Sequence, residues 1–145
     1  MLSFSGSIFY IYAKFKIMDK KIIATAAVLG CIAIILGAFG AHALKEVLDV
    51  NQLISFETGV RYQMYHALFL LFIGSTNYVS EKAKKSIYYF VLSGVVLFSG
   101  SIYFLATRAI TGLDIRAIGI VTPIGGLLMI LGWGLLFLNI IKKKG

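Results

Sequence analysis

Apolar residues follow one another along this chain in four long segments, with short polar connections between them. The segments are residues 22–44, 60–78, 86–110 and 117–141. Each comes close to or exceeds the roughly 20 residues that an α-helix needs to cross about 30 Å of hydrocarbon. The pattern predicts an all-α membrane protein with four transmembrane helices in one bundle.

The connection between the first two segments, residues 45–59, is long enough to form an element of its own. Its apolar residues recur at roughly helical spacing among charged and amide side chains: Val47, Leu48, Leu53, Ile54 and Phe56. We predict a surface-lying amphipathic helix between spans 1 and 2.

The first seventeen residues, MLSFSGSIFYIYAKFKI, stand apart from this pattern. Their apolar part is too short to span a membrane, and their lysines follow it, which is opposite to the order in a secretory signal. From Met18, the stretch MDKKIIATAAVLG is an ordinary start for an inner-membrane protein. The sequence therefore favours residues 18–145 as the native transmembrane domain, with residues 1–17 as an added extension. The alternative is an interfacial extension carried by Phe9, Tyr10, Tyr12 and Phe15.

Composition supports a membrane location, because 59% hydrophobic residues and a mean hydropathy of +0.91 exceed what so small a soluble domain could bury. The lipid bilayer is thus the expected partner. The formal charge of +8 lies in short clusters beside apolar runs, which is typical of membrane proteins and argues against nucleic-acid binding. Cys31 is the only cysteine, so no intrachain disulfide can form.

Basic residues predict the orientation, since they gather on the cytoplasmic side of inner-membrane proteins. With four spans, ten of the fourteen basic residues fall on the side of the termini and four on the other side. We therefore predict a multi-pass protein of the bacterial plasma membrane with both termini in the cytoplasm.

Small residues at helical spacing indicate where the helices touch, because association in lipid depends on close van der Waals contact. Ala33, Gly37 and Ala41 form one such stripe in the first span. Further pairs occur in the third and fourth spans: Gly94 with Ser101, and Thr122 with Gly126.

Polar side chains at the membrane edge form the candidate site. Gln63 and His66 share one face of the second span, Arg61 lies at its outer boundary, and His42 lies at the outer end of the first. Polar groups at this depth need partners, so three interpretations compete. The cluster is a structural clamp between helices, a site for a small molecule or lipid headgroup with Arg61 as the anion contact, or a haem or metal site of the two histidines.

The sequence gives little support for transport coupled to protons or for catalysis. All six acidic residues lie in termini, loops or helix ends, which argues against a proton-driven exporter. No nucleophile elbow, zinc-protease or phosphate-loop motif occurs. We therefore expect neither an enzyme nor a bound cofactor or metal.

Several blocks resemble one known family. LGAFGAHALK, residues 36–45, and FETGVRYQMYHALFLL, residues 56–71, followed by LFSGSIYFLA and TPIGGLLMILGW, are similar to the small inner-membrane protein family of unknown function typified by YgdD. The resemblance covers residues 18–133 and implies four transmembrane helices, a plasma membrane location and no established activity.

Together these observations predict a non-enzymatic structural or accessory membrane component that packs against another membrane protein or forms a homo-oligomer. The alternative is a small carrier or a lipid- or small-molecule-binding protein with an outer-leaflet polar site.

Overall fold

The computed structural model describes residues 4–113 and 115–143, and its regular structure in these ranges is entirely helical. The four α-helices are α1 (Phe4–Ala41), α2 (Val50–Ser75), α3 (Glu81–Thr111) and α4 (Ile118–Lys142). A 3-10 turn, η1 (Leu44–Glu46), follows α1. The prediction of an all-α fold is confirmed.

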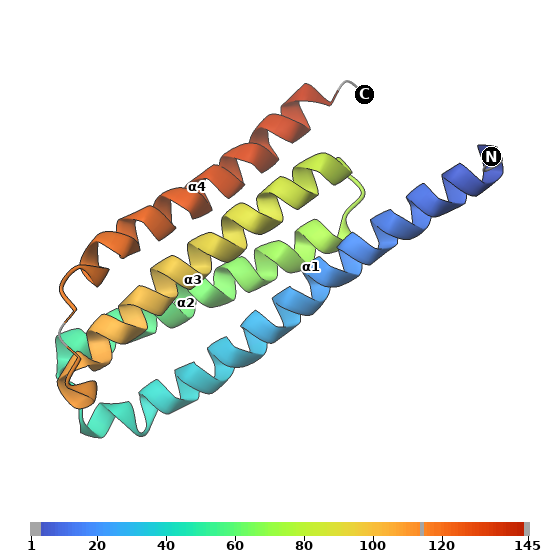
Figure 1. Ribbon diagram of the computed structural model, residues 1–145. Coiled ribbons are helices and arrows are strands. Elements are labelled where there is room, and N and C mark those ends of the chain that lie inside the picture. Colours follow the sequence, from blue (N-terminus) through green and yellow to red (C-terminus); the bar gives the residue numbers. More distant parts are fainter. Residues whose placement is uncertain (1–3, 114, 144–145) are drawn as a thin grey trace.

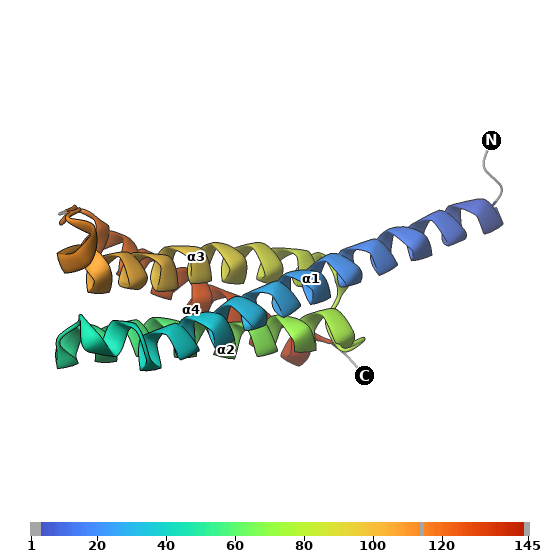
Figure 2. The ribbon, with the colours of Figure 1, turned by 90° about the horizontal axis from the view of Figure 1, so that it is seen from below.

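The helices run up and down in sequence order, so each packs mainly on its neighbours along the chain (Figure 1). The α2–α3 turn lies at one end of the bundle, where α4 also ends. We call this the α2–α3 end. The α1–α2 and α3–α4 connections lie at the opposite end. Seen from below, α1 projects well past the other helices toward the N-terminus (Figure 2).

Helix α1 is longer than the sequence pattern indicated. It begins at Phe4 instead of near residue 22, and its 38 residues extend about 57 Å at 1.5 Å per residue. The predicted boundary followed the lysines before residue 22, but lysine is a good helix former and does not end a helix. The lysines before residue 22 therefore did not indicate where helix α1 begins.

The prediction of a separate amphipathic helix in residues 45–59 is wrong, because most of this segment belongs to α2. A capping box starts α2 at Val50: Asp49 Oδ1 accepts the backbone N–H of Gln52 at 2.9 Å, and Gln52 Oε1 accepts that of Asp49 at 3.0 Å. The helix then continues through Gly59 to Ser75. Gly59 does not interrupt α2 but allows close packing, since a Cβ there would lie 2.7 Å from the ring of Tyr103.

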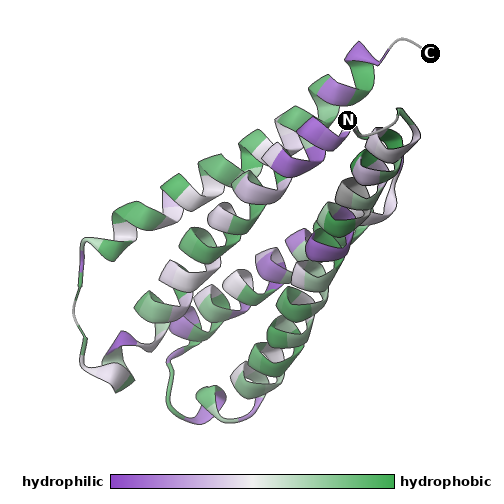
Figure 3. Ribbon diagram, turned by 45° about the vertical axis from the view of Figure 1, so that its right-hand side comes forward, coloured by the Kyte–Doolittle hydropathy of each residue, from purple (hydrophilic) through white to green (hydrophobic). Residues whose placement is uncertain are grey.

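In the described residues, three helical segments are long and apolar enough to cross a membrane: α1 with η1, α3 and α4. Many large apolar side chains on the outer surface are exposed, including Ile34, Leu68, Ile130 and Phe137. In Figure 3, α4 is apolar or neutral along most of its length and hydrophilic near its C-terminal end. Such a surface is suited to lipid, as the composition predicted.

The structure places the three small residues of the α1 stripe in different surroundings. Ala33 is buried and a Cβ at Gly37 would lie 3.5 Å from Val60, but Ala41 is exposed at the end of the helix. The buried face instead combines Ala33 with Ala26 and Gly40, which are seven residues to either side. Residues that repeat every seven positions stay on the side of a helix that faces a nearly antiparallel neighbour.

The α3–α4 contact contains the predicted small residues. A Cβ at Gly94 would lie 2.9 Å from the carbonyl oxygen of Gly125, and the Ser101 and Thr122 hydroxyls are 2.6 Å apart. Gly126 takes a lesser part, because a Cβ there would make only ordinary contact with Phe98, at 3.7 Å. A Cβ at Gly125 would clash with the backbone nitrogen of Phe98, so the two helices pack closely at this glycine.

Candidate functional site

Two polar clusters in the described residues are built around buried side chains, one inside the bundle and one at its α2–α3 end. The first, which we call the inner polar cluster, consists of Gln63 and His66 on α2 with their hydrogen-bond partners. The second, the Lys84 cluster, consists of Asp19, Glu81 and Lys84 at the α2–α3 end. The sequence predicted the α2 members of the first cluster and missed the second.

Gln63 connects three helices. Its amide Nε2 donates to the carbonyl oxygen of Leu29 on α1 at 2.8 Å, and its Oε1 accepts from the Tyr103 hydroxyl on α3 at 2.8 Å. The side chain is 4% exposed. Both ends of the amide are therefore used within the bundle, as burial of a polar group requires.

His66 lies one turn further along α2 and has a partner on each ring nitrogen. Nδ1 is 2.7 Å from the carbonyl oxygen of Tyr62, and Nε2 accepts from the indole N–H of Trp133 on α4 at 3.2 Å. A carbonyl only accepts and an indole only donates, so the proton is on Nδ1 and the ring is neutral. The Trp133 ring also stacks on Phe69, with centroids 4.0 Å apart.

The structure separates the other two candidate residues from this pair. His42 is exposed just beyond the end of α1, and the contacts found in the described ranges include none between His42 and His66. Arg61 is also exposed, and its Nη2 lies 3.5 Å from the Thr58 hydroxyl on its own helix. The four residues thus do not form one site.

A metal or haem site finds no donor set in the part of the chain that the structure describes. No group of three or more His, Cys, Asp or Glu side chains is placed to hold a metal ion there. In addition, both nitrogens of His66 already face partners, so ligation would break one of the two hydrogen bonds.

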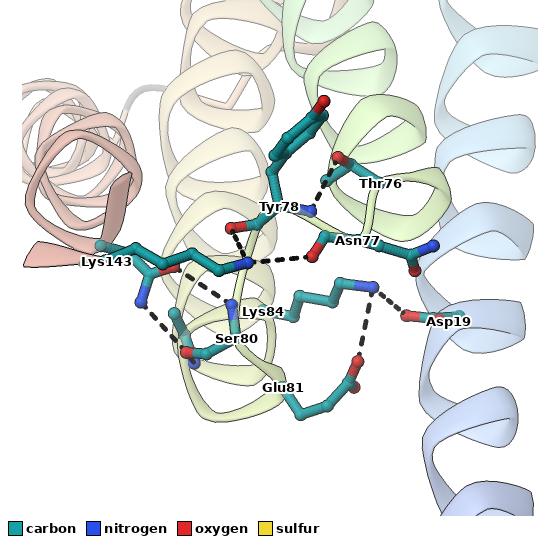
Figure 4. Close-up of polar contacts among 10 residues, drawn as sticks. Asp19, Thr76, Asn77, Tyr78, Ser80, Glu81, Lys84 and Lys143 are labelled. Carbon is teal, nitrogen blue, oxygen red and sulfur yellow. Dashed lines mark hydrogen bonds and ion pairs between the residues drawn. The ribbon is translucent and has the colours of Figure 1, made fainter. Parts of the chain in front are cut away.

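The Lys84 cluster lies where α1 passes the start of α3 (Figure 4). Lys84 is 1% exposed, and its Nζ lies 2.8 Å from Asp19 Oδ1 and 3.5 Å from Glu81 Oε1. The two carboxylate side chains are 27% and 31% exposed. A buried ammonium thus faces two carboxylates that retain contact with the surroundings, the pairing that a buried charge needs.

Further hydrogen bonds fix the turn beside this cluster. Ser80 caps α3, and its hydroxyl also accepts from Asn139 Nδ2 on α4 at 3.0 Å. Lys143 donates to the carbonyl oxygens of Asn77 and Tyr78 at 3.4 and 3.3 Å (Figure 4). The α2–α3 turn is therefore tied to α1 on one side and to α4 on the other.

Comparisons with known proteins agree on one family. Residues 36–126 match the family described as "Protein of unknown function (DUF423)". The chain is 37% identical over 126 residues to a "UPF0382 membrane protein" of Staphylococcus epidermidis. This match covers 87% of the chain and 99% of the relative. The chain is also 36% identical over 124 residues to the "UPF0382 inner membrane protein YgdD" of Escherichia coli. That match covers 82% of the chain and 88% of the relative. No solved structure matches the chain.

Proposed function

This chain belongs to the DUF423 family of membrane proteins, and from that premise we propose that it is a non-enzymatic structural or accessory component of the membrane, in which α2 completes a four-helix transmembrane bundle. Its expected partner is another membrane protein or a second copy of itself. The proposal also includes a plasma membrane location with both termini in the cytoplasm.

The observation that carries this proposal is that the inner polar cluster is satisfied within the bundle. Each polar side-chain atom of Gln63 and His66 has a hydrogen-bond partner on the chain itself, and both side chains are buried. Interhelical hydrogen bonds of this kind hold transmembrane helices together. The apolar outer surface leaves contact with lipid or with another apolar surface as the main interaction.

The polar residues of α2 are compatible with a fourth span. Its polar members Gln63 and His66 face α1, α3 and α4, so lipid does not meet them. Intramembrane polar residues usually face the interior of a bundle in this way. The orientation rests on the excess of basic residues at the α2–α3 end, where Lys82, Lys85 and Lys142 are exposed.

The alternative of an outer-leaflet ligand site needs Arg61 beside the histidines. Because Arg61 and His42 are exposed and apart from Gln63 and His66, that arrangement has no support in the geometry.

Purification in mild detergent tests the proposal. We expect a stoichiometric protein partner by mass spectrometry, or a dimer or higher oligomer by light scattering. A monomer that retains a small molecule, and loses it in Arg61→Ala, would contradict the proposal and support the alternative. For the orientation, a reporter that fluoresces only in the cytoplasm is fused to the C-terminus, and a dark fusion would reverse it.

A further inference from the structure

A groove of about 480 Å³ lies between α1 and α3 at the α2–α3 end of the bundle. Ile17 and Met18 form its α1 wall, and Tyr89 on α3 lies opposite. Three lysines line it as well: Lys21, Lys82 and Lys85. The groove therefore combines apolar side chains with three lysines.

The charge balance of this groove is positive. Its one carboxylate, Glu81, faces Lys84 at 3.5 Å, and Lys84 is also paired with Asp19. The Lys84 cluster thus leaves one uncompensated negative charge beside three lysines. Lys82 and Lys85 have exposed side chains, so their ammonium groups can turn toward a ligand. The groove suits an anion.

Lys21 is already positioned. Its Nζ lies 3.2 Å from the Tyr89 hydroxyl and about 5 Å from the centres of the Tyr88 and Tyr89 rings, at 5.5 and 5.3 Å. These contacts hold the ammonium at the groove and leave it protons to donate, since an ammonium has three. An anion here meets a lysine whose side chain is already ordered.

A second hollow adjoins the groove on the outer surface, between α3 and α4. It measures about 440 Å³, shares Lys85 and Tyr89 with the first, and continues past Phe90 and Ser93 to Leu128 on α4. From Lys85 to Ser93 the helix rises about 12 Å at 1.5 Å per residue. Lysines beside an open apolar hollow fit a molecule with an anionic head and a hydrocarbon tail.

We propose that this groove binds an anionic phospholipid, with its phosphate on Lys21, Lys82 and Lys85 and an acyl chain along Phe90 and Leu128. Basic pockets between transmembrane helices on the cytoplasmic side bind anionic headgroups in this manner. The proposal rests on the transmembrane bundle proposed above but not on the protein partner.

The test is a titration of the detergent-purified protein with phosphatidylglycerol, followed by native mass spectrometry. The variant is Lys82→Gln with Lys85→Gln, and the matched control is Lys20→Gln with Lys142→Gln, which removes two exposed lysines outside this groove. Each lysine near an anionic headgroup contributes about fivefold, so the variant is expected to bind on the order of 25-fold more weakly. The control is expected to bind as the unsubstituted chain does.

Three outcomes overturn the proposal. They are equal binding by the variant and the unsubstituted chain, an equal loss in the control, and equal binding of phosphatidylcholine, which carries no net charge. Inorganic phosphate added at the same concentration separates a lipid site from a simple anion site, because only a lipid site resists competition. A monomeric protein without a protein partner leaves this result intact, so the two proposals fail independently.

Discussion

The two buried polar clusters differ in charge and in position, and the difference shows what each contributes to the bundle. Gln63 and His66 are neutral, and their partners are carbonyl, phenol and indole groups. Lys84 is charged, and its partners are two partly exposed carboxylates at the α2–α3 end. Neutral groups occur inside the bundle and charged groups at its edge.

This division follows from the energetics of burial. A neutral amide or imidazole loses modest hydration energy when buried, and one or two hydrogen bonds compensate for it. An ammonium loses far more and needs a counter-charge at close range, and the remaining polar atoms of the pair need further hydrogen bonds. The Lys84 cluster is therefore expected to be the more sensitive of the two to removal of one member.

The largest effect is expected for Lys84→Met. The change keeps the side-chain volume but leaves Asp19 and Glu81 facing each other without the ammonium between them. Because the Asp19 and Glu81 side chains are 27% and 31% exposed, we expect a loss of about 2 kcal/mol, below the roughly 3–5 kcal/mol of a fully buried pair. Unfolding in mixed detergent micelles measures it.

Two further variants test this assignment. Lys20→Met changes an exposed lysine next to Asp19 and should alter stability by less than about 0.5 kcal/mol. The double variant Asp19→Asn with Lys84→Met should recover part of the loss, since it removes one of the unpaired charges. If Lys84→Met and Lys20→Met are equally stable, the Lys84 cluster contributes nothing to the fold.

The sequence indicated Gln63 and His66 but not the Lys84 cluster for a physical reason. Gln63 and His66 are conspicuous because they interrupt an apolar run. Lys84 lies in EKAKK, a run of charges that is typical of a solvated loop, and Asp19 is 65 positions away. Only the packing of α1 against the start of α3 distinguishes Lys84 from Lys82 and Lys85.

The fold shows a similar limit. Apolar runs predicted four helices in the correct order, because hydropathy along the chain is a local property. The ends of α1 and α2 depended on other factors: helix propensity carries α1 back to Phe4, and the Asp49 capping box sets the start of α2. The supposed partnership of His42 with His66 assumed that groups at the same depth meet. The partner of His66 is instead Trp133, whose side chain is half-exposed on α4.

An intermediate effect is expected for Gln63→Leu, which tests the neutral side of the comparison. The variant leaves the Tyr103 hydroxyl and the Leu29 carbonyl without the amide, and interhelical hydrogen bonds in membranes average about 0.6 kcal/mol. We expect a loss of about 1 kcal/mol in the same unfolding measurement. Adding Tyr103→Phe removes the unpaired hydroxyl and should restore part of the stability. A loss as large as that of Lys84→Met would remove the distinction between the two clusters.

The smallest effect concerns the coupling of His42 to His66. His66→Ala removes hydrogen bonds to Tyr62 and Trp133 and should destabilise the bundle, whereas His42→Ala changes an exposed side chain beyond α1 and should have little effect. Residues without shared partners add within about 0.5 kcal/mol, so the interaction energy from a double-mutant cycle should be close to zero. The matched cycle of His66→Ala with Trp133→Phe should give a clear interaction energy, since the indole N–H donates directly to the imidazole at 3.2 Å. The contrary result is a coupling above about 0.5 kcal/mol between the two histidines and none between His66 and Trp133. It would mean that the two histidines interact in the membrane, as the sequence had indicated, and that Trp133 is not a partner of His66.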